Sequence, residues 1–468
     1  MRSRLTRLRH TLAACLAAAP LVAAAAAPAF PDDAEIRRML AVRVDQQGQA
    51  TGIVIGLTGP HGRRVVTYGS AAAGRGALSG ATVFDIGSVT KVFTALLLAD
   101  MVRRGELKLD DAMAGCLPAA AAKLPPRGGR PITLLDLATH TAGLPLRPFN
   151  LPSKDPHAPY AGYTPALLFA ALSSLHPDHD PGARYQYSNL GYGLLARALA
   201  QRAGKPFDEL LRSRITGPLG MADTTAELRD DFRGRLATGY DARLRPVPHW
   251  EFGALDGAGG LRSTANDLLD LLDAALGRRQ TALAPALKMT AQPRRPGPDA
   301  ATAAALGWNV STDRAHPIVW KNGSVGGFRS YIGYDPAGAI GVVALANAQT
   351  GFGADDIALH LLDPAEPVNL YTADGRRAVQ LAPRALDRYV GRYRFASDNT
   401  VLSVSRDGDR LWSQQDGQQD FQLFAESDGD FFLKALDIQL HFEHAGSGPA
   451  GQLVVRQDGQ EDRAARLP

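Results

Sequence analysis

A nearly continuous apolar segment at residues 92–102 limits most strongly what this chain can fold into. Its composition and length predict a helix that is buried in the core of a domain. Two arginines and Gly105 follow it and supply an ordinary helix end. A short β-type run at residues 83–87 comes directly before it and ends in glycine. We therefore expect Ser88 to lie at the mouth of a buried helix.

Ser88 and Lys91 lie three residues apart, so a helix that begins here places both side chains on one face. The chain has eight lysines against forty-three arginines. A lysine amine can lose its proton when it is buried, whereas a guanidinium stays charged. The pair thus suits a nucleophilic serine with an adjacent base. The alternative is that Ser88 only caps the helix and Lys91 is solvated.

The N-terminal region predicts export from the cytoplasm. Four arginines, an apolar stretch to residue 27 and small residues around Pro28 have the features of a signal peptide at residues 1–29. Its removal takes the formal charge from +4 to 0, so the basic balance does not indicate a nucleic-acid partner. With no second long apolar segment, no transmembrane helix is predicted, and a periplasmic or secreted location is expected.

The two cysteines predict neither a lipid anchor nor an internal disulfide. Residues 12–15 resemble a lipoprotein cleavage box, but Cys15 lies near the beginning of the apolar run rather than at its end, so a lipid anchor is the less favoured reading. Loss of the signal peptide leaves Cys116 as the single cysteine. An internal disulfide is therefore not expected.

Length and composition predict two soluble globular domains, with 45% hydrophobic and 21% charged residues. Strand patterns at residues 53–57 and 64–68 form a hairpin signal, and three more strands are predicted at 318–322, 328–334 and 340–346. Helical patterns occupy 35–44, 133–138, 165–174, 190–202, 206–214, 264–276 and 354–362. This order predicts an α+β domain over residues 30–365, with an antiparallel sheet built from distant segments and flanked by helices.

The composition changes after residue 365. Residues 366–385 are predicted to be a linker, and residues 386–468 contain about seven short alternating segments separated by glycine and aspartate turns. Such a pattern predicts a small antiparallel barrel or sandwich. A stabilising cover or assembly surface is the favoured role for it, with a ligand-holding barrel as the alternative.

Two further segments carry polar side chains that suit the Ser88 chemistry. Tyr187 and Asn189 lie two residues apart, so an extended loop points both the same way. Lys321 ends a predicted strand, and Gly323 has no side chain that would obstruct a substrate along that edge. Each segment is common alone, but the order and spacing of the three together are specific.

On these motifs the chain resembles the serine β-lactamase and penicillin-binding-protein superfamily, and within it the class C β-lactamase branch. The resemblance covers residues 34–362 and the tail resembles a lipocalin-like domain. It implies a β-lactamase/transpeptidase-like fold and a serine hydrolase that acts on C–N bonds. The branch includes β-lactamases, D-Ala-D-Ala carboxypeptidases and endopeptidases, D-aminopeptidases and certain esterases.

The resemblance implies a catalytic set of Ser88, Lys91, Tyr187 and Lys321. Ser88 would attack the substrate carbonyl, and either Lys91 or the phenolate of Tyr187 would take its proton. Lys321 would lower the pKa of Tyr187 by favouring the phenolate.

The resemblance also implies a substrate-binding and oxyanion set of Asn189, Asn322, Gly323, Ser324 and Arg329. Asn189 would bond the substrate amide and steady Lys91. The backbone N–H groups of Ser88 and Ser324 would hold the oxyanion, where the loss of one donor costs about 3 kcal/mol of barrier.

This chain differs from the class C β-lactamase pattern in two features that bear on the choice of substrate. Asn322 stands where β-lactamases usually carry threonine, and no lysine or arginine occurs between Asn347 and Arg376, where class C enzymes bind the drug carboxylate. Arg329 is the remaining candidate for a carboxylate. His140 suggests a Ser–His arrangement, but its segment favours a structural role.

The leading hypothesis is therefore a periplasmic serine hydrolase that cleaves an amide in D-amino-acid peptides or β-lactams. The alternatives are an esterase using the same residues and a non-catalytic penicillin-binding sensor or scaffold. The expected partner is a small peptide, β-lactam or ester substrate. No metal cluster, phosphate loop or dinucleotide motif is visible in the sequence, so no cofactor is expected.

Overall fold

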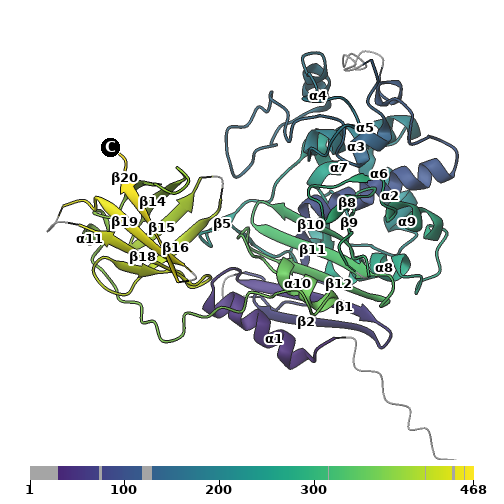
Figure 1. Cartoon of the computed structure of the whole chain (residues 1–468). Coiled ribbons are helices and arrows are strands. Elements are labelled where there is room, and N and C mark those ends of the chain that lie inside the picture. Colours follow the sequence, from purple (N-terminus) through teal and green to yellow (C-terminus); the bar gives the residue numbers. More distant parts are fainter. Residues whose placement is uncertain are drawn as a thin grey trace, which may run out of the picture.

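The computed structural model describes residues 30–72, 76–118, 129–314, 316–416, 418–444, 448–457 and 459–468. The predicted signal peptide and Cys15 lie outside the described residues. The chain forms a larger α+β domain and a smaller β-barrel beside it (Figure 1). Among the described residues, none of the helices is long and apolar enough to cross a lipid bilayer.

The larger domain is built on an eight-stranded sheet in the order β2-β1-β12-β11-β10-β9-β8-β7. Its strands are β1 (Gly52–Gly59), β2 (Gly62–Gly69), β7 (Arg295–Pro296), β8 (Thr302–Ala304), β9 (Asn309–Ser311), β10 (Val319–Val325), β11 (Phe328–Asp335) and β12 (Ile340–Ala346). β1 pairs antiparallel with β12, with Ile53 opposite Ala346. The sheet therefore joins the two ends of this domain, as the sequence predicts.

Helices cover both faces of this sheet (Figure 1). The helices of the larger domain, some of which pack on one another rather than on the sheet, are α1 (Asp33–Ala41), α2 (Thr90–Arg103), α3 (Leu134–Ala138), α4 (Pro165–Leu172), α5 (Asn189–Ala203), α6 (Phe207–Leu211), α7 (Asp256–Gly259), α8 (Ala265–Ala275), α9 (Ala284–Thr290) and α10 (Asp355–Leu362). The side chains of β12 alternate between two cores: Val342 and Ala344 pack with α1 and α10, whereas Val343 and Leu345 face the larger core around α2, α5 and α8.

The predicted buried helix is α2, which lies inside the larger core. All of its residues from Thr90 to Met101 are buried. Short ladders hold the segments around it, namely β3 (Val83–Asp85) with β6 (Arg262–Thr264) and β4 (Gly239–Tyr240) with β5 (Pro246–Val247). The predicted helices and strands are all present within a few residues. The sequence patterns missed α7, α9 and the strands β4–β9, which are short and supported mainly by tertiary pairing.

The smaller domain is a closed antiparallel barrel of eight strands in chain order. They are β13 (Gly391–Phe395), β14 (Val401–Asp407), β15 (Arg410–Gln415), β16 (Asp420–Ala425), β17 (Asp430–Phe432), β18 (Ile438–Glu443), β19 (Gln452–Gln457) and β20 (Gln460–Arg466). β13 pairs with β20 and closes the barrel. A short helix, α11 (Pro383–Leu386), precedes it. The barrel, one of two architectures left open by the sequence, is thereby confirmed, with eight strands rather than about seven.

The segment between the domains is bonded to both of them. Asn369 donates its backbone N–H to Asp356 of α10 at 2.9 Å and its side-chain amide to the carbonyl of Ala435 in the barrel at 2.9 Å. The barrel also contacts the larger domain directly, through the ion pair of Arg243 with Asp420 at 2.7 Å. The first part of the predicted linker, around Asn369, therefore lies between the two domains and is bonded to both, whereas several of its later residues are exposed.

Candidate active site

Ser88 lies in a tight turn, Gly87–Val89, that leads into α2. The turn needs glycine before the serine, because Gly87 has a φ of +47°. A Cβ atom at Gly87 would also approach the backbone nitrogen of Ser324 to 3.2 Å. The local sequence therefore presses the Ser88 turn against β10 and leaves the serine half-buried at the start of the helix.

Lys91 is completely buried one turn further along α2. Its Nζ lies 3.1 Å from Ser88 Oγ, 2.8 Å from Asn189 Oδ1 and 2.6 Å from the carbonyl oxygen of Ala258. Burial, assisted by the charge of Lys321, lowers the pKa of Lys91 well below its usual value. In its neutral form this amine can donate to the two carbonyl acceptors and direct its lone pair at Ser88.

Tyr187 approaches Ser88 from the other side. Its hydroxyl donates a hydrogen bond of 2.6 Å to Ser88 Oγ. Burial raises the pKa of Tyr187, so the group is a phenol. The net shift of this pKa is thus opposite to the one expected from Lys321, whose Nζ lies 5.5 Å from the ring centre, because the loss of water around the phenolate dominates.

Lys321 lies on β10 with its side chain turned toward the serine side of the sheet. Only 6% of it is exposed, and its Nζ donates to the carbonyl of Asn322 at 2.8 Å. Burial lowers its pKa to about 8, against the opposing effect of Asp355. Lys321 thus contributes a positive charge beside Tyr187 at neutral pH and loses that charge in mild alkali.

Gly323 has a packing role rather than the open edge that the sequence suggests. A Cβ atom there would overlap the carbonyl oxygen of Ile86 and would lie 3.0 Å from the backbone nitrogen of Ser88. The missing side chain therefore lets β10 approach the nucleophile turn. This approach brings the backbone of Ser324 beside the backbone of Ser88, as a shared oxyanion site requires.

Asn322 and Arg329 are both engaged by one carboxylate. Asp355, at the beginning of α10, accepts from Asn322 Nδ2 at 3.1 Å and from Arg329 Nη2 at 2.8 Å. Burial raises the pKa of Asp355, while Arg329 and Asn322 oppose that shift. Arg329 thus already holds a carboxylate of the protein itself.

Asn189 is the first residue of α5 and connects the site to the segment that carries Tyr160. Its Oδ1 accepts from Lys91, and its Nδ2 donates to the hydroxyl of Tyr160 at 3.0 Å. Tyr160 comes from the proline-rich segment and is buried against Phe252. For Tyr160 the sequence favours simple loop packing, with a place in a site as the alternative. Sequence reasoning missed the carbonyl of Ala258, for which a glycine-rich stretch was the only signal.

His140 supports Tyr187 and makes no hydrogen bond to Ser88. Its Nδ1 accepts the backbone N–H of Ser188 at 3.1 Å, and its ring lies 4.3 Å from the ring of Tyr187. Burial lowers the pKa of His140 well below its usual value, so the ring is neutral. These contacts fit the structural role expected from the sequence.

Within the parts of the chain that the structure describes, no group of three histidine, cysteine or acidic side chains is arranged to hold a metal ion. The chemistry available at this site is that of a serine hydroxyl between a neutral amine and a phenol, with backbone donors close by. Such an arrangement suits attack on a carbonyl carbon.

Comparison with known proteins agrees with this geometry. The β-lactamase family matches residues 33–365, and a domain of unknown function, DUF3471, matches residues 375–465. The D-alanyl-D-alanine-carboxypeptidase/endopeptidase AmpH of Escherichia coli K12 is 33% identical over 56% of this chain and 69% of its own length. A β-lactamase of Lysobacter lactamgenus is 28% identical over 71% of this chain and 91% of its own.

A solved structure extends the likeness to both domains. The octameric penicillin-binding protein homologue of Pyrococcus abyssi covers 92% of this chain and 100% of its own, with a TM-score of 0.65 and 22% identity. At that identity the likeness concerns the fold alone. The family match over most of the chain and the AmpH likeness carry the assignment: this chain belongs to the β-lactamase family of serine hydrolases.

Proposed function

We propose that this protein is an exported serine hydrolase that forms an acyl-enzyme on Ser88 and cleaves an amide bond, in a cell-wall-type D-amino-acid peptide or in a β-lactam ring. The observation that carries the proposal is the convergence of Lys91 and Tyr187 on Ser88 Oγ, at 3.1 and 2.6 Å. The AmpH likeness supports the peptide substrate.

Acylation begins when Ser88 passes its proton to the neutral amine of Lys91 and attacks the substrate carbonyl. The backbone N–H groups of Ser88 and Ser324 stabilise the resulting oxyanion. Tyr187, protonated in the resting enzyme, donates its proton to the departing amine nitrogen as the C–N bond breaks. The low pKa of Lys91 and the raised pKa of Tyr187 support this division of roles.

Deacylation uses water and the same groups in reverse. The Tyr187 phenolate takes a proton from a water molecule, and the hydroxide attacks the ester carbon on Ser88. Lys91 returns its proton to Ser88 Oγ as the acid product leaves. Both carbonyl acceptors of Lys91, on Asn189 and Ala258, stabilise the charged amine between the two half-reactions.

An esterase is the second candidate, and one observation favours it. Arg329 is paired with Asp355, and the stretch between Asn347 and Arg376 contains no lysine or arginine. A substrate without a carboxylate would need neither. The acyl-enzyme on Ser88 is common to both candidates.

The test compares hydrolysis of nitrocefin, a D-Ala-D-Ala peptide and a short-chain p-nitrophenyl ester by the wild type, Ser88→Ala and Ser324→Ala. Ser88→Ala should abolish turnover of every substrate, whereas Ser324→Ala keeps its backbone N–H and should stay active. Intact-mass measurement after addition of penicillin should show an adduct on the wild type and on Ser324→Ala but not on Ser88→Ala. Full activity of Ser88→Ala would refute the proposal, and preference for the ester would select the second candidate.

Export rests on residues 1–29 and has its own test. Expression of the full chain in a Gram-negative host should yield a mature protein in the periplasm or medium that begins near Phe30. An intact N-terminus in the cytoplasmic fraction would refute export without affecting the proposed chemistry.

A further inference from the structure

The barrel interior is filled at one end and open at the other. Tyr389, Tyr393, Phe431 and Phe442 pack together in the filled end, with ring centroids 4.9 Å apart for Tyr389 and Phe431 and 5.5 Å apart for Tyr393 and Phe442. None of these four lines the open end, which holds a cavity of about 630 Å³. A cavity of this size is within the range of small-molecule sites, and an eight-stranded barrel has room for one small ligand.

The cavity leaves apolar side chains unburied inside the barrel. Five of them point into it from different strands and turns and are only partly buried: Leu402, Phe421, Leu436, Ile438 and Val455. Alternation along the strands directs these residues inward, since Leu402 lines the cavity and the neighbouring Ser403 does not. An apolar occupant would remove this surface from water at about 25 cal/mol per Å².

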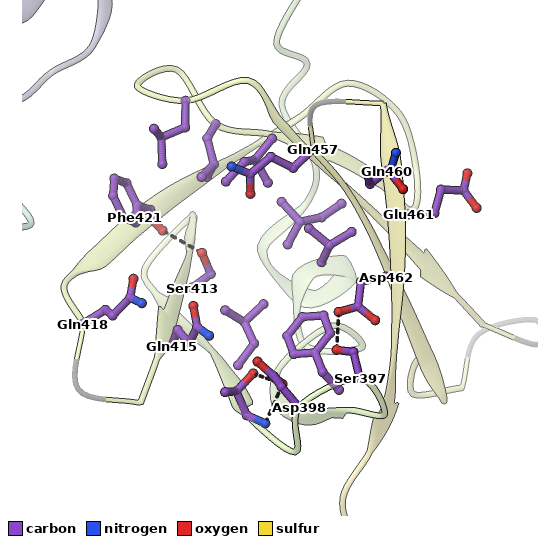
Figure 2. A pocket seen from close by; sticks show the side chains of 18 of the residues that line it. Ser397, Asp398, Ser413, Gln415, Gln418, Phe421, Gln457, Gln460, Glu461 and Asp462 are labelled. Carbon is purple, nitrogen blue, oxygen red and sulfur yellow. Dashed lines mark hydrogen bonds between the residues drawn. The ribbon is translucent and has the colours of Figure 1, made fainter. Parts of the chain in front are cut away.

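The rim of the cavity is polar and includes acidic side chains. Figure 2 shows Ser413, Gln415 and Phe421 on one wall, with Gln460 and Asp462 on the opposite wall. Five glutamines belong to the lining: Gln415, Gln418, Gln419, Gln457 and Gln460. Each carries a donor and an acceptor, which suits hydroxyl or amide groups.

Three acidic residues, Asp398, Glu461 and Asp462, also line the rim. Glu461 is paired with Arg456 at 2.7 Å, whereas Asp462 accepts the hydroxyl of Ser397 at 2.6 Å and the backbone N–H of Arg463 at 2.8 Å. The described residues that line the cavity include no lysine, arginine or histidine. A negatively charged head group would therefore meet repulsion at this rim.

We propose that the barrel cavity is a second ligand site, distinct from the serine site, which takes an amphiphile with an alkyl or aromatic body and a head that carries no negative charge. The apolar body lies against the five partly buried side chains, and the head bonds the glutamines at the rim. The inference does not depend on the proposed hydrolase activity.

Calorimetric titration of the full-length protein tests this site with two probes of equal chain length, octyl glucoside and octanoate, each below its critical micelle concentration. We expect one octyl glucoside per chain and at least tenfold weaker binding of octanoate. Leu402→Asp places a charge among the apolar side chains that line the cavity and should weaken octyl glucoside binding at least tenfold. Ser403→Asp adds the same charge on the outer face and should change it less than twofold.

Leu436→Asp, in the turn between β17 and β18, repeats the test should Leu402→Asp fail to fold. Absence of octyl glucoside binding would overturn the site, as would equal losses in Leu402→Asp and Ser403→Asp. Octanoate binding as tight as that of octyl glucoside would overturn the assigned chemical class. Hydrolysis by Leu402→Asp should match the wild type, which separates this site from Ser88.

Discussion

The amine of Lys91, in the first turn of the buried helix α2, lies 3.1 Å from the hydroxyl of Ser88, in the tight turn that leads into this helix. Because two carbonyl oxygens accept the hydrogens of this amine, its third tetrahedral position faces the serine. Removal of water lowers the pKa of Lys91. The turn and the helix that follows it thus provide the nucleophile and its base, with no need for a histidine.

Replacing Lys91 tests this relationship. Lys91→Met should slow acylation about 10²- to 10⁴-fold, the usual contribution of a general base. Lys91→Arg should be as slow, because a guanidinium keeps its proton. Burst kinetics with nitrocefin give the rate, and Lys205→Arg on the exposed surface serves as the control. Wild-type acylation by Lys91→Met would assign the base elsewhere.

The charge on Lys321 should set the alkaline limit for substrates with a carboxylate. Because its pKa is about 8, the amine is charged below that pH and neutral above it. Between pH 7 and pH 9, kcat/KM should fall roughly tenfold for a D-Ala-D-Ala peptide and stay level for a neutral ester. Lys321→Arg should flatten the peptide profile. An unchanged alkaline fall in that variant would assign the titration to another group.

Asp355 should restrict the binding of anionic substrates, since it holds both Arg329 and Asn322. Asp355→Asn removes the negative charge and frees the guanidinium for a substrate carboxylate. The KM for a penicillin should fall roughly tenfold, equivalent to about 1.4 kcal/mol. Asp374→Asn, on the exposed linker, is the control. An unchanged KM would show that Arg329 does not reach the substrate.

Gly323→Ala tests whether glycine is needed here so that β10 can pack against the Ser88 turn, or only leaves room for a substrate. Its Cβ atom would press on the Ile86 carbonyl and on the nitrogen of Ser88, so activity should fall at least 10²-fold and Tm should decrease. At Gly115 a Cβ atom meets nothing within 4 Å, so Gly115→Ala should leave both unchanged. Equal behaviour of the two variants would contradict the packing role.

Asp267 should make the larger domain less stable as the pH rises. Burial raises its pKa to about 6, above its ordinary value of 3.8. The protonated carboxyl of Asp267 therefore favours the folded state. This contribution to stability is complete below pH 3.8 and is lost as the pH rises through 6. Asp267→Asn keeps an acceptor for Asp223 N and Thr224 Oγ1. Its Tm relative to wild type should rise by several degrees between pH 4.5 and 7.5, and a constant difference would contradict the assignment.

The sequence by itself determined the fold class, the buried helix behind Ser88 and the three motifs, because periodicity, glycine placement and residue spacing are local properties. Tertiary structure decided the pKa of Tyr187, the packing of Gly323 and the pairing of Arg329 with Asp355. These depend on water exclusion and on contacts between segments far apart in the chain. The barrel cavity belongs with them, since alternation shows which side chains point inward but not whether they fill the space between them.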